Sequence, residues 1–163
     1  MIRLKSLLAM MLVVCAVEAR GEEEPRVTLE NVEPPPAISP DEPLREEFSP
    51  ALAARYLDSA ALHWQKQRKC GTCHTNFAYL MARPALKSVS PPSLEVRKFF
   101  ESMVEKRWED QGPRWDAEVV VTAALLAAND RLTTGKLSPV TRKAFQRMWK
   151  LQREDGGWDW LEC

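Results

Sequence analysis

The sequence predicts an all-α protein, and three observations lead to this class. Apolar residues recur at helical spacing in several segments after residue 48, for example Val96, Phe99 and Phe100. Two Ser-Pro pairs, at residues 49–50 and 138–139, combine a capping hydroxyl with a proline suited to the first helical position. No segment alternates apolar and polar residues as a half-buried strand does. We therefore expect helical hairpins and no sheet.

The first two helices are expected to form one hairpin. The first begins at residues 49–50 and places Leu57, Ala61 and Trp64 at helical spacing. A short second helix carries Phe77 and Leu80 and ends near residue 84, where a proline stands.

Three further helices are expected after residue 90. The first of them opens after residues 91–93 and carries an amphipathic stripe from Val96 to Val104. The second, from Trp115 to Leu126, is apolar almost all round, which predicts burial on most of its sides. The last opens at residues 138–139 and places Ala144 and Met148 on one face.

The N-terminal residues are predicted to lie outside the helical domain. Residues 1–19 have the pattern of a secretory signal peptide, with Arg3 and Lys5 before a short apolar run and a small-residue cleavage site at Ala19. The run is too short to span a bilayer, and no longer one follows it. Residues 20–48 hold six of the 12 prolines and few large apolar side chains, so we expect a disordered, extended linker that acts as a passive tether. The helical domain is then 49–163, in an exported, periplasmic protein without a transmembrane segment after cleavage.

The charge balance argues against one class of partner. The chain has 23 basic and 23 acidic residues, and removal of residues 1–19 leaves 21 and 22. Nucleic-acid binding usually requires a strongly basic domain or stripe, and this near balance supplies neither. We therefore expect no nucleic-acid partner.

The pentapeptide Cys70-Gly71-Thr72-Cys73-His74 is the strongest functional signal in the chain. Two cysteines two apart and followed at once by histidine form the attachment pattern of c-type haem. Thiols about one helical turn apart can each join one vinyl group of a porphyrin, and the adjacent histidine can ligate the iron. The motif predicts a covalent haem c held by Cys70 and Cys73, with His74 as the metal ligand.

Other interpretations of the same residues stay open. An oxidising compartment also allows a structural disulfide between Cys70 and Cys73, which is the main alternative. Zinc could be held by Cys70, Cys73 and His74 with His63 or Cys163, although structural zinc sites usually show two separated ligand pairs. A thioredoxin-type role is disfavoured because no strand accompanies the motif.

The sixth ligand of such a haem is not identified by the sequence. His63 is the only other histidine, and we expect it to be a packing residue beside Trp64. Met81 lies seven residues after His74, on the same helical face, and can hardly reach the opposite side of a porphyrin ring. Met103 and Met148 are freer, and either could approach a haem in the fold, although core packing is the more typical role of such residues.

An internal repeat sharpens the expected architecture. Residues 64–73 align with residues 149–158, so that the tryptophan, the Gln-Arg pair and the first glycine coincide, and a Ser-Pro helix start precedes each copy. Repeats of this kind stack into α/α solenoids or closed toroids. In the first copy the cysteines lie at the corner where the second copy has residues 155–158.

The segment from Lys143 to Trp158 resembles the QW motif of squalene–hopene cyclases and prenyltransferase-like α/α toroids. More broadly, residues from about 53 to 163 are similar to bacterial exported squalene-cyclase-like proteins that carry a Cys-x-x-Cys-His motif in the first hairpin. The resemblance implies that Gln152 ties the helix end to the turn and that Trp158 stacks on it. It also implies the hairpins of an α/α toroid, which this number of hairpins would leave incomplete.

The activity of the cyclases does not follow from this resemblance. Their acid motif, Asp-x-Asp-Asp, is absent, and Asp155 and Asp159 have the wrong spacing for it. Asp116 and Glu118 are weak acid–base candidates, because a first-turn position at a helix start explains both. The sequence therefore makes no positive case for an enzyme.

The leading hypothesis is an exported, cytochrome c-like haem protein for electron transfer or redox sensing, with an unidentified redox partner. The alternatives are a cofactor-free, squalene-cyclase-like binding module with a Cys70–Cys73 disulfide, and a fragment of a terpenoid-processing enzyme.

Overall fold

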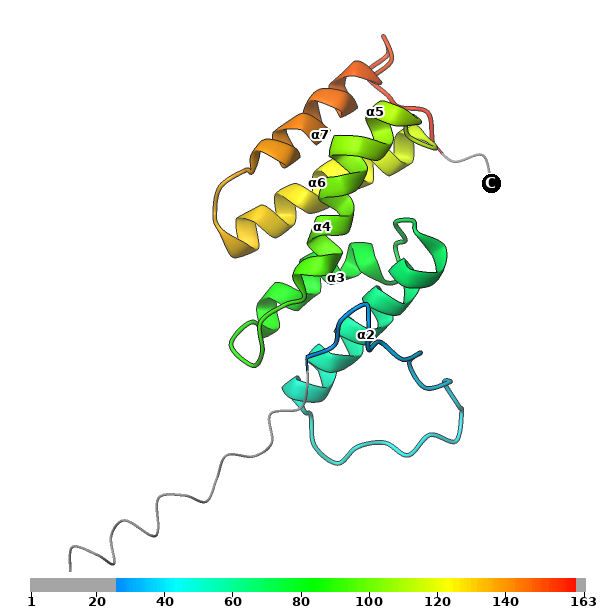
Figure 1. Cartoon of the computed structure of the whole chain (residues 1–163), viewed down its shortest axis with the longest axis vertical. Helices are drawn as coiled ribbons and strands as arrows, with labels where there is room; N and C mark the ends of the chain where they lie inside the picture. Colours follow the sequence, from blue (N-terminus) through cyan, green and yellow to red (C-terminus); the bar gives the residue numbers. More distant parts are fainter. Residues whose placement is uncertain (1–25, 161–163) are drawn as a thin grey trace, which may run out of the picture.

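The computed structural model describes residues 26–160, and this part of the chain forms helices and turns without a strand. The all-α prediction is confirmed. The five longer helices are α2 (Pro50–Arg68), α3 (Asn76–Ala82), α4 (Leu94–Ser102), α6 (Asp116–Thr133) and α7 (Pro139–Lys150). In Figure 1, α4 runs between the α2–α3 hairpin and the α6–α7 hairpin. The predicted signal peptide, residues 1–19, lies outside the described residues.

Serine caps begin three of these helices. The hydroxyl of Ser49 accepts a hydrogen bond from the backbone N–H of Leu52 at 3.4 Å, and proline follows at the first helical position. Ser138 does the same for α7, accepting from the N–H of Thr141 at 3.1 Å. Ser93 caps α4. Both Ser-Pro helix starts predicted from the sequence are therefore confirmed.

The third predicted helix extends further than its apolar stripe. After α4 the chain continues through a π-helical turn, Met103–Arg107, into the short α5, Trp108–Asp110. The indole N–H of Trp108 donates to the Glu118 carboxylate at 2.8 Å, and Arg107 pairs with the same carboxylate. These contacts anchor the end of this helical run to the start of α6.

The apolar core lies where α4 meets both hairpins. Phe77 of α3 stacks on Phe100 of α4 with ring centroids 4.9 Å apart, and Phe99 meets Phe100 edge-on. The predicted stripe is confirmed at Val96 and Phe100, both fully buried. Other buried members are Leu62, Leu80, Met103, Val104, Val119, Leu126 and Met148. Burial of such side chains contributes about 1.5–3 kcal/mol each.

A buried ion pair joins α2 to the end of α3. The guanidinium of Arg83, in the 3-10 turn Arg83–Leu86, is fully buried and makes two 3.0 Å hydrogen bonds to the carboxylate of Asp58. The hydroxyl of Tyr79 donates to the same carboxylate at 2.6 Å and accepts from the N–H of Ser93 at 2.7 Å. Burial, reinforced by the bond to Asp58, raises the pKa of Tyr79. This network fixes the two arms of the first hairpin.

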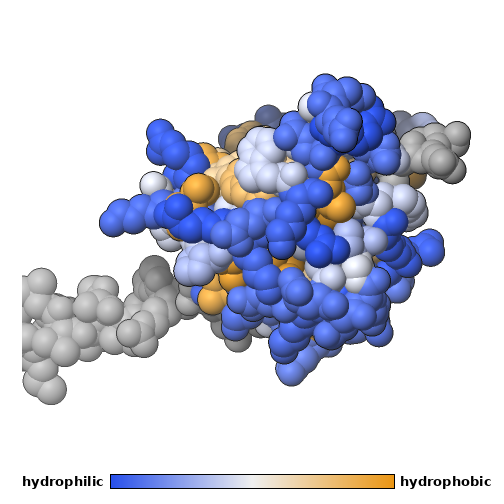
Figure 2. All heavy atoms as spheres, turned by 90° about the horizontal axis from the view of Figure 1, so that it is seen from above, coloured by the Kyte–Doolittle hydropathy of each residue, from blue (hydrophilic) through white to orange (hydrophobic). Residues whose placement is uncertain are grey.

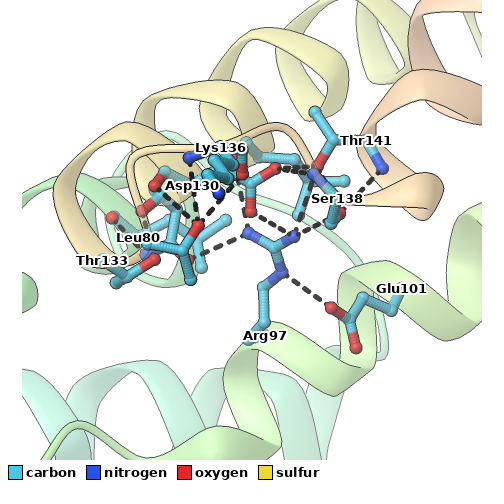
Figure 3. Close-up of polar contacts among 11 residues, drawn as sticks. Leu80, Arg97, Glu101, Asp130, Thr133, Lys136, Ser138 and Thr141 are labelled. Carbon is cyan, nitrogen blue, oxygen red and sulfur yellow. Dashed lines mark hydrogen bonds and ion pairs between the residues drawn. The ribbon is translucent and has the colours of Figure 1, made fainter.

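A second network joins α4 to the other hairpin (Figure 3). Arg97 pairs with Asp130 of α6 at 2.8 Å and donates to the hydroxyl of Ser138 at 3.1 Å. Asp130 in turn accepts from the hydroxyl of Thr141 at 2.6 Å. The side chain of Asn129 donates to the carbonyl of Leu80 at 2.8 Å, which brings α3 into the same assembly.

The predicted linker is only partly detached from the domain. Val32 is buried and Val27 and Leu29 pack against the core, and the N–H of Leu29 donates to the Glu95 carboxylate at 3.0 Å. From residue 33 to 48 the chain is mostly exposed and has no helix. The passive-tether interpretation of residues 20–48 is therefore wrong for residues 27–32, because three apolar side chains within six residues suffice to pack on the core.

The described helices include none that is long and apolar enough to cross a bilayer. The face drawn in Figure 2 is largely hydrophilic, and polar side chains interrupt its apolar areas.

We predict that the Asp58→Ala substitution lowers the free energy of unfolding by about 3–5 kcal/mol, because it leaves the buried Arg83 charge without its partner. Urea unfolding followed by circular dichroism measures the loss. The matched control is Glu109→Ala, which removes the exposed 3.3 Å pair with Lys143 and should cost less than about 1 kcal/mol. Similar losses in the two variants would contradict this assignment.

Candidate functional site

The Cys70–His74 motif lies in the corner between α2 and α3 (Figure 1). The helix α2 ends as Lys69 enters the left-handed conformation, with φ of 52°, and its N–H donates to the carbonyl of Gln65 at 3.2 Å. A turn over residues 73–75 then leads into α3. The motif therefore occupies a loop and a turn between the two helices, at the corner position that the repeat predicted.

Two side chains hold the backbone of this loop. The side-chain amide of Asn76 donates to the carbonyl of Cys70 at 3.0 Å, and its oxygen accepts from the N–H of Thr72 at 2.9 Å. The indole N–H of Trp64 donates to the same Cys70 carbonyl at 3.2 Å. Because Asn76 is fully buried, these bonds fix the loop against the domain. Sequence analysis missed Asn76, since a single asparagine after the motif carries no periodic signal.

Close packing explains the glycine of the motif. A Cβ at Gly71 would lie 2.7 Å from Cε2 of the Phe77 ring, well inside van der Waals contact. The ring cannot withdraw easily, because it stacks on Phe100 in the core. Gly71 therefore lets the loop approach α3 closely, and Phe77 fills the inner side of the loop.

The side chains of the motif that carry chemistry differ in their exposure. Cys70 is partly buried, whereas Cys73 and His74 are exposed. Both cysteines are free thiols. The loop therefore combines a backbone held by buried partners with a thiol and an imidazole that an outside molecule can reach.

These residues fit the covalent attachment of a porphyrin. Attachment requires reduced, accessible thiols and a nearby imidazole, and all three groups occur within five residues of one loop. Zinc requires a different arrangement, in which all ligands meet at one point about 2.3 Å from sulfur. In the part of the chain that the structure describes, no three His, Cys, Asp or Glu side chains gather in that way. Cys163 lies outside the described residues.

The candidates for a sixth ligand differ in their burial. Met103 and Met148 are 2% and 7% exposed and belong to the core, as expected. Either could reach a group on the surface only if the core opened. His63 is partly buried on α2, and Met81 is 51% exposed on α3. The structure thus brings none of these four residues into a defined pair with His74.

Asp116 and Glu118 have structural partners. Glu118 is buried between Arg107 and Trp108, as described above, and a carboxylate oxygen of Asp116 accepts from the backbone N–H of Asp159 at 3.2 Å. The two carboxylates connect neighbouring elements at the start of α6.

In the turn after α7, Gln152 makes a contact of the kind expected, whereas Trp158 has the helix α7 as its partner and not Gln152. The side-chain amide of Gln152 donates to the carbonyl of Gly156 at 2.8 Å. The Trp158 indole donates to the carbonyl of Met148 at 2.8 Å, and its ring centroid lies 5.9 Å from that of Trp149. Trp64 also bonds a carbonyl across its corner, but in the opposite direction, from the helix to the loop.

A groove lies between the N-terminal segment and α2. Its walls include Val27, Pro34, Leu52 and Tyr56, and none of its lining residues belongs to the Cys70–His74 loop.

Comparison with known proteins adds no identification: the chain matches no family model, and no similar curated protein or solved structure was found. The resemblance to squalene-cyclase-like proteins therefore rests on the sequence motifs alone.

We predict that Asn76→Ala releases the loop. Loss of two hydrogen bonds from a buried side chain should lower the free energy of unfolding by about 1–3 kcal/mol and speed hydrogen exchange at the Thr72 amide. The control is Asn31→Ala, which removes a hydrogen-bonded but exposed asparagine in the N-terminal segment. Unchanged exchange at Thr72 in Asn76→Ala would show that Asn76 does not hold the loop.

Proposed function

We propose that this chain is an exported c-type haem protein that transfers electrons or senses redox state in the periplasm. Cys70 and Cys73 form the covalent links, and His74 ligates the iron. The observation that supports this most is the combination of two free thiols and an exposed imidazole on one loop whose backbone is held by Asn76 and Trp64.

Each residue has a distinct part in this proposal. Each thiol adds across one vinyl C=C bond, so that sulfur joins one carbon and a hydrogen joins the other, and no oxidant is required. The cysteines must therefore be reduced at attachment. His74 offers an imidazole nitrogen at the position that directly follows the second link. When bound, haem supplies a one-electron Fe(II)/Fe(III) couple.

The scaffold belongs to the same proposal. We assign the two hairpins to a squalene-cyclase-like α/α toroid, on the internal repeat and on the contacts of Gln152 and Trp158 at its second corner. Export rests on the sequence pattern of residues 1–19. The buried partners of Glu118 and the absence of the Asp-x-Asp-Asp motif give cyclase chemistry no support.

The decisive test is expression of the full chain in bacteria that mature c-type cytochromes. We expect an intact mass increased by one haem and a Soret band that remains with the polypeptide after denaturation. Cys73→Ala should abolish or strongly reduce both. His74→Ala should keep the covalent mass while it shifts the spectrum, because only the iron ligand is lost.

The control for this experiment is Lys87→Ala, an exposed residue after α3 that should leave mass and spectrum unchanged. A mass of polypeptide alone, from cells that mature a reference cytochrome in parallel, would refute the haem assignment. In that case a mass two hydrogens lower that persists in the Cys163→Ser variant would identify the Cys70–Cys73 disulfide and the cofactor-free module.

A further inference from the structure

The end of α2 presents three positive side chains directly before the motif. Lys66, Arg68 and Lys69 are all exposed, and Lys69 is the residue bonded to Cys70. Among the described residues, no ion pair involves any of the three. Arg68 lies over the ring of Trp64, with its guanidinium carbon 5.7 Å from the centroid, so the same tryptophan that holds the loop also holds this cation near it.

The sequence around these cations contains no compensating acid. No Asp or Glu occurs between Asp58 and Glu95. Both flanking carboxylates are engaged, since Asp58 pairs with the buried Arg83 and Glu95 accepts from the N–H of Leu29. The exposed charge carried by the first hairpin is therefore positive, although the whole chain is formally neutral.

The positive charge lies next to the loop that carries Cys73 and His74, where it can act on an approaching ion. Charges within about 10 Å of a reacting group act on an approaching ion before salt screens them. Lys69 is bonded to Cys70, and Arg68 lies over Trp64, whose indole donates to the Cys70 carbonyl, so these two cations lie beside the loop that carries the exposed thiol and imidazole. A local field of this kind steers oppositely charged partners and raises association rates by about 10-fold or more.

We infer that Lys66, Arg68 and Lys69 form a docking surface for an acidic protein that exchanges electrons at the Cys70–His74 loop. The redox role of this partner rests on the proposed function, whereas the positive field at the loop does not. The partner would meet the cations through a cluster of Asp and Glu side chains. Such pairs at the rim of an interface mainly set the rate and specificity of encounter, so complex formation should weaken steeply with salt.

The field can be measured on the protein without a cofactor. The full chain is prepared with Cys73 as its only cysteine, by the substitutions Cys15→Ser, Cys70→Ser and Cys163→Ser. The Cys73 thiolate then attacks an aromatic disulfide and forms a mixed disulfide with one half of the reagent. The S–S bond of the reagent breaks, and the other half leaves as a thiolate or, after proton uptake, as a thione, either of which is followed by its absorbance. The rate with the dianion 5,5′-dithiobis(2-nitrobenzoate) is divided by the rate with neutral 4,4′-dithiodipyridine, which cancels differences in accessibility and in the thiol pKa.

We expect this ratio to fall about 10-fold between low and high ionic strength. In the triple variant Lys66→Glu, Arg68→Glu, Lys69→Glu, the ratio at low salt should fall close to the value that the natural chain has at high salt. The matched control is Lys87→Glu, a cation of the same acid-free stretch that lies after α3 and is also exposed. It should change the ratio less than twofold. If the ratio does not change with ionic strength, or if it changes equally in the triple variant and in Lys87→Glu, the inference is overturned.

The haem-loaded protein provides the second readout. One electron passes from the reduced protein to hexacyanoferrate(III), an anion, or to tris(phenanthroline)cobalt(III), a cation. We expect salt to slow the first reaction and to speed the second, and the triple variant to reverse that order. If no haem attaches, the proposed function fails while the thiol ratio still decides whether the field exists.

An acidic segment of a second copy of this chain could bind the same three cations, and sedimentation distinguishes this case. Sedimentation at low salt should show a monomer for both the natural chain and the triple variant. A dimer that only the triple variant disrupts would assign this surface to a second copy and overturn the inference.

Discussion

The buried pair between Asp58 and Arg83 sets the geometry on which the candidate site depends. Asp58 belongs to α2 and Arg83 follows α3, so the pair fixes the separation of the two arms of the hairpin. Tyr79 and Ser93 extend the same network towards the start of α4. The loop over residues 69–75 has to span arms that are already held. A buried ion pair of this kind favours one arrangement, because any other would leave a charge unpaired.

The loop itself separates a structural side from a chemical side. On the inner side, Phe77 fills the space beside Gly71 and Asn76 bonds both Cys70 and Thr72. On the outer side, Cys73 and His74 are open to solvent. A group bound by these side chains has to be reached from the outer side, since the inner side is closed. Burial of the backbone partners thus leaves the reactive groups exposed without leaving the loop loose.

Local signals predicted the helices, and long-range pairing explains what the sequence analysis missed. Ser49 and Ser138 could be recognised as helix starts because each cap involves only residues up to three positions along the chain. The burial of Val96 and Phe100 follows from the 3.6-residue period of the apolar residues. The sequence analysis did not identify the buried role of Arg83, because its partner lies 25 residues away. The role of Asn76 is hidden for a similar reason, since it depends on a turn that no periodicity describes. The corner position of the cysteines was predicted, whereas their cofactor stays a prediction.

The two corners of the repeat are held by different sets of hydrogen bonds. After α7, Gln152 bonds within its turn and Trp158 bonds back to the helix, so the corner closes on itself. After α2, the equivalent turn has no such glutamine contact, and Asn76 from the next helix performs the closing bonds instead. Residues 70–73, which align with residues 155–158, therefore do not need the side chains that stabilise the second corner. Cysteine can then occupy two of them without loss of the corner. The first corner can carry the Cys-x-x-Cys-His motif because Asn76 of α3 forms the hydrogen bonds that hold its turn.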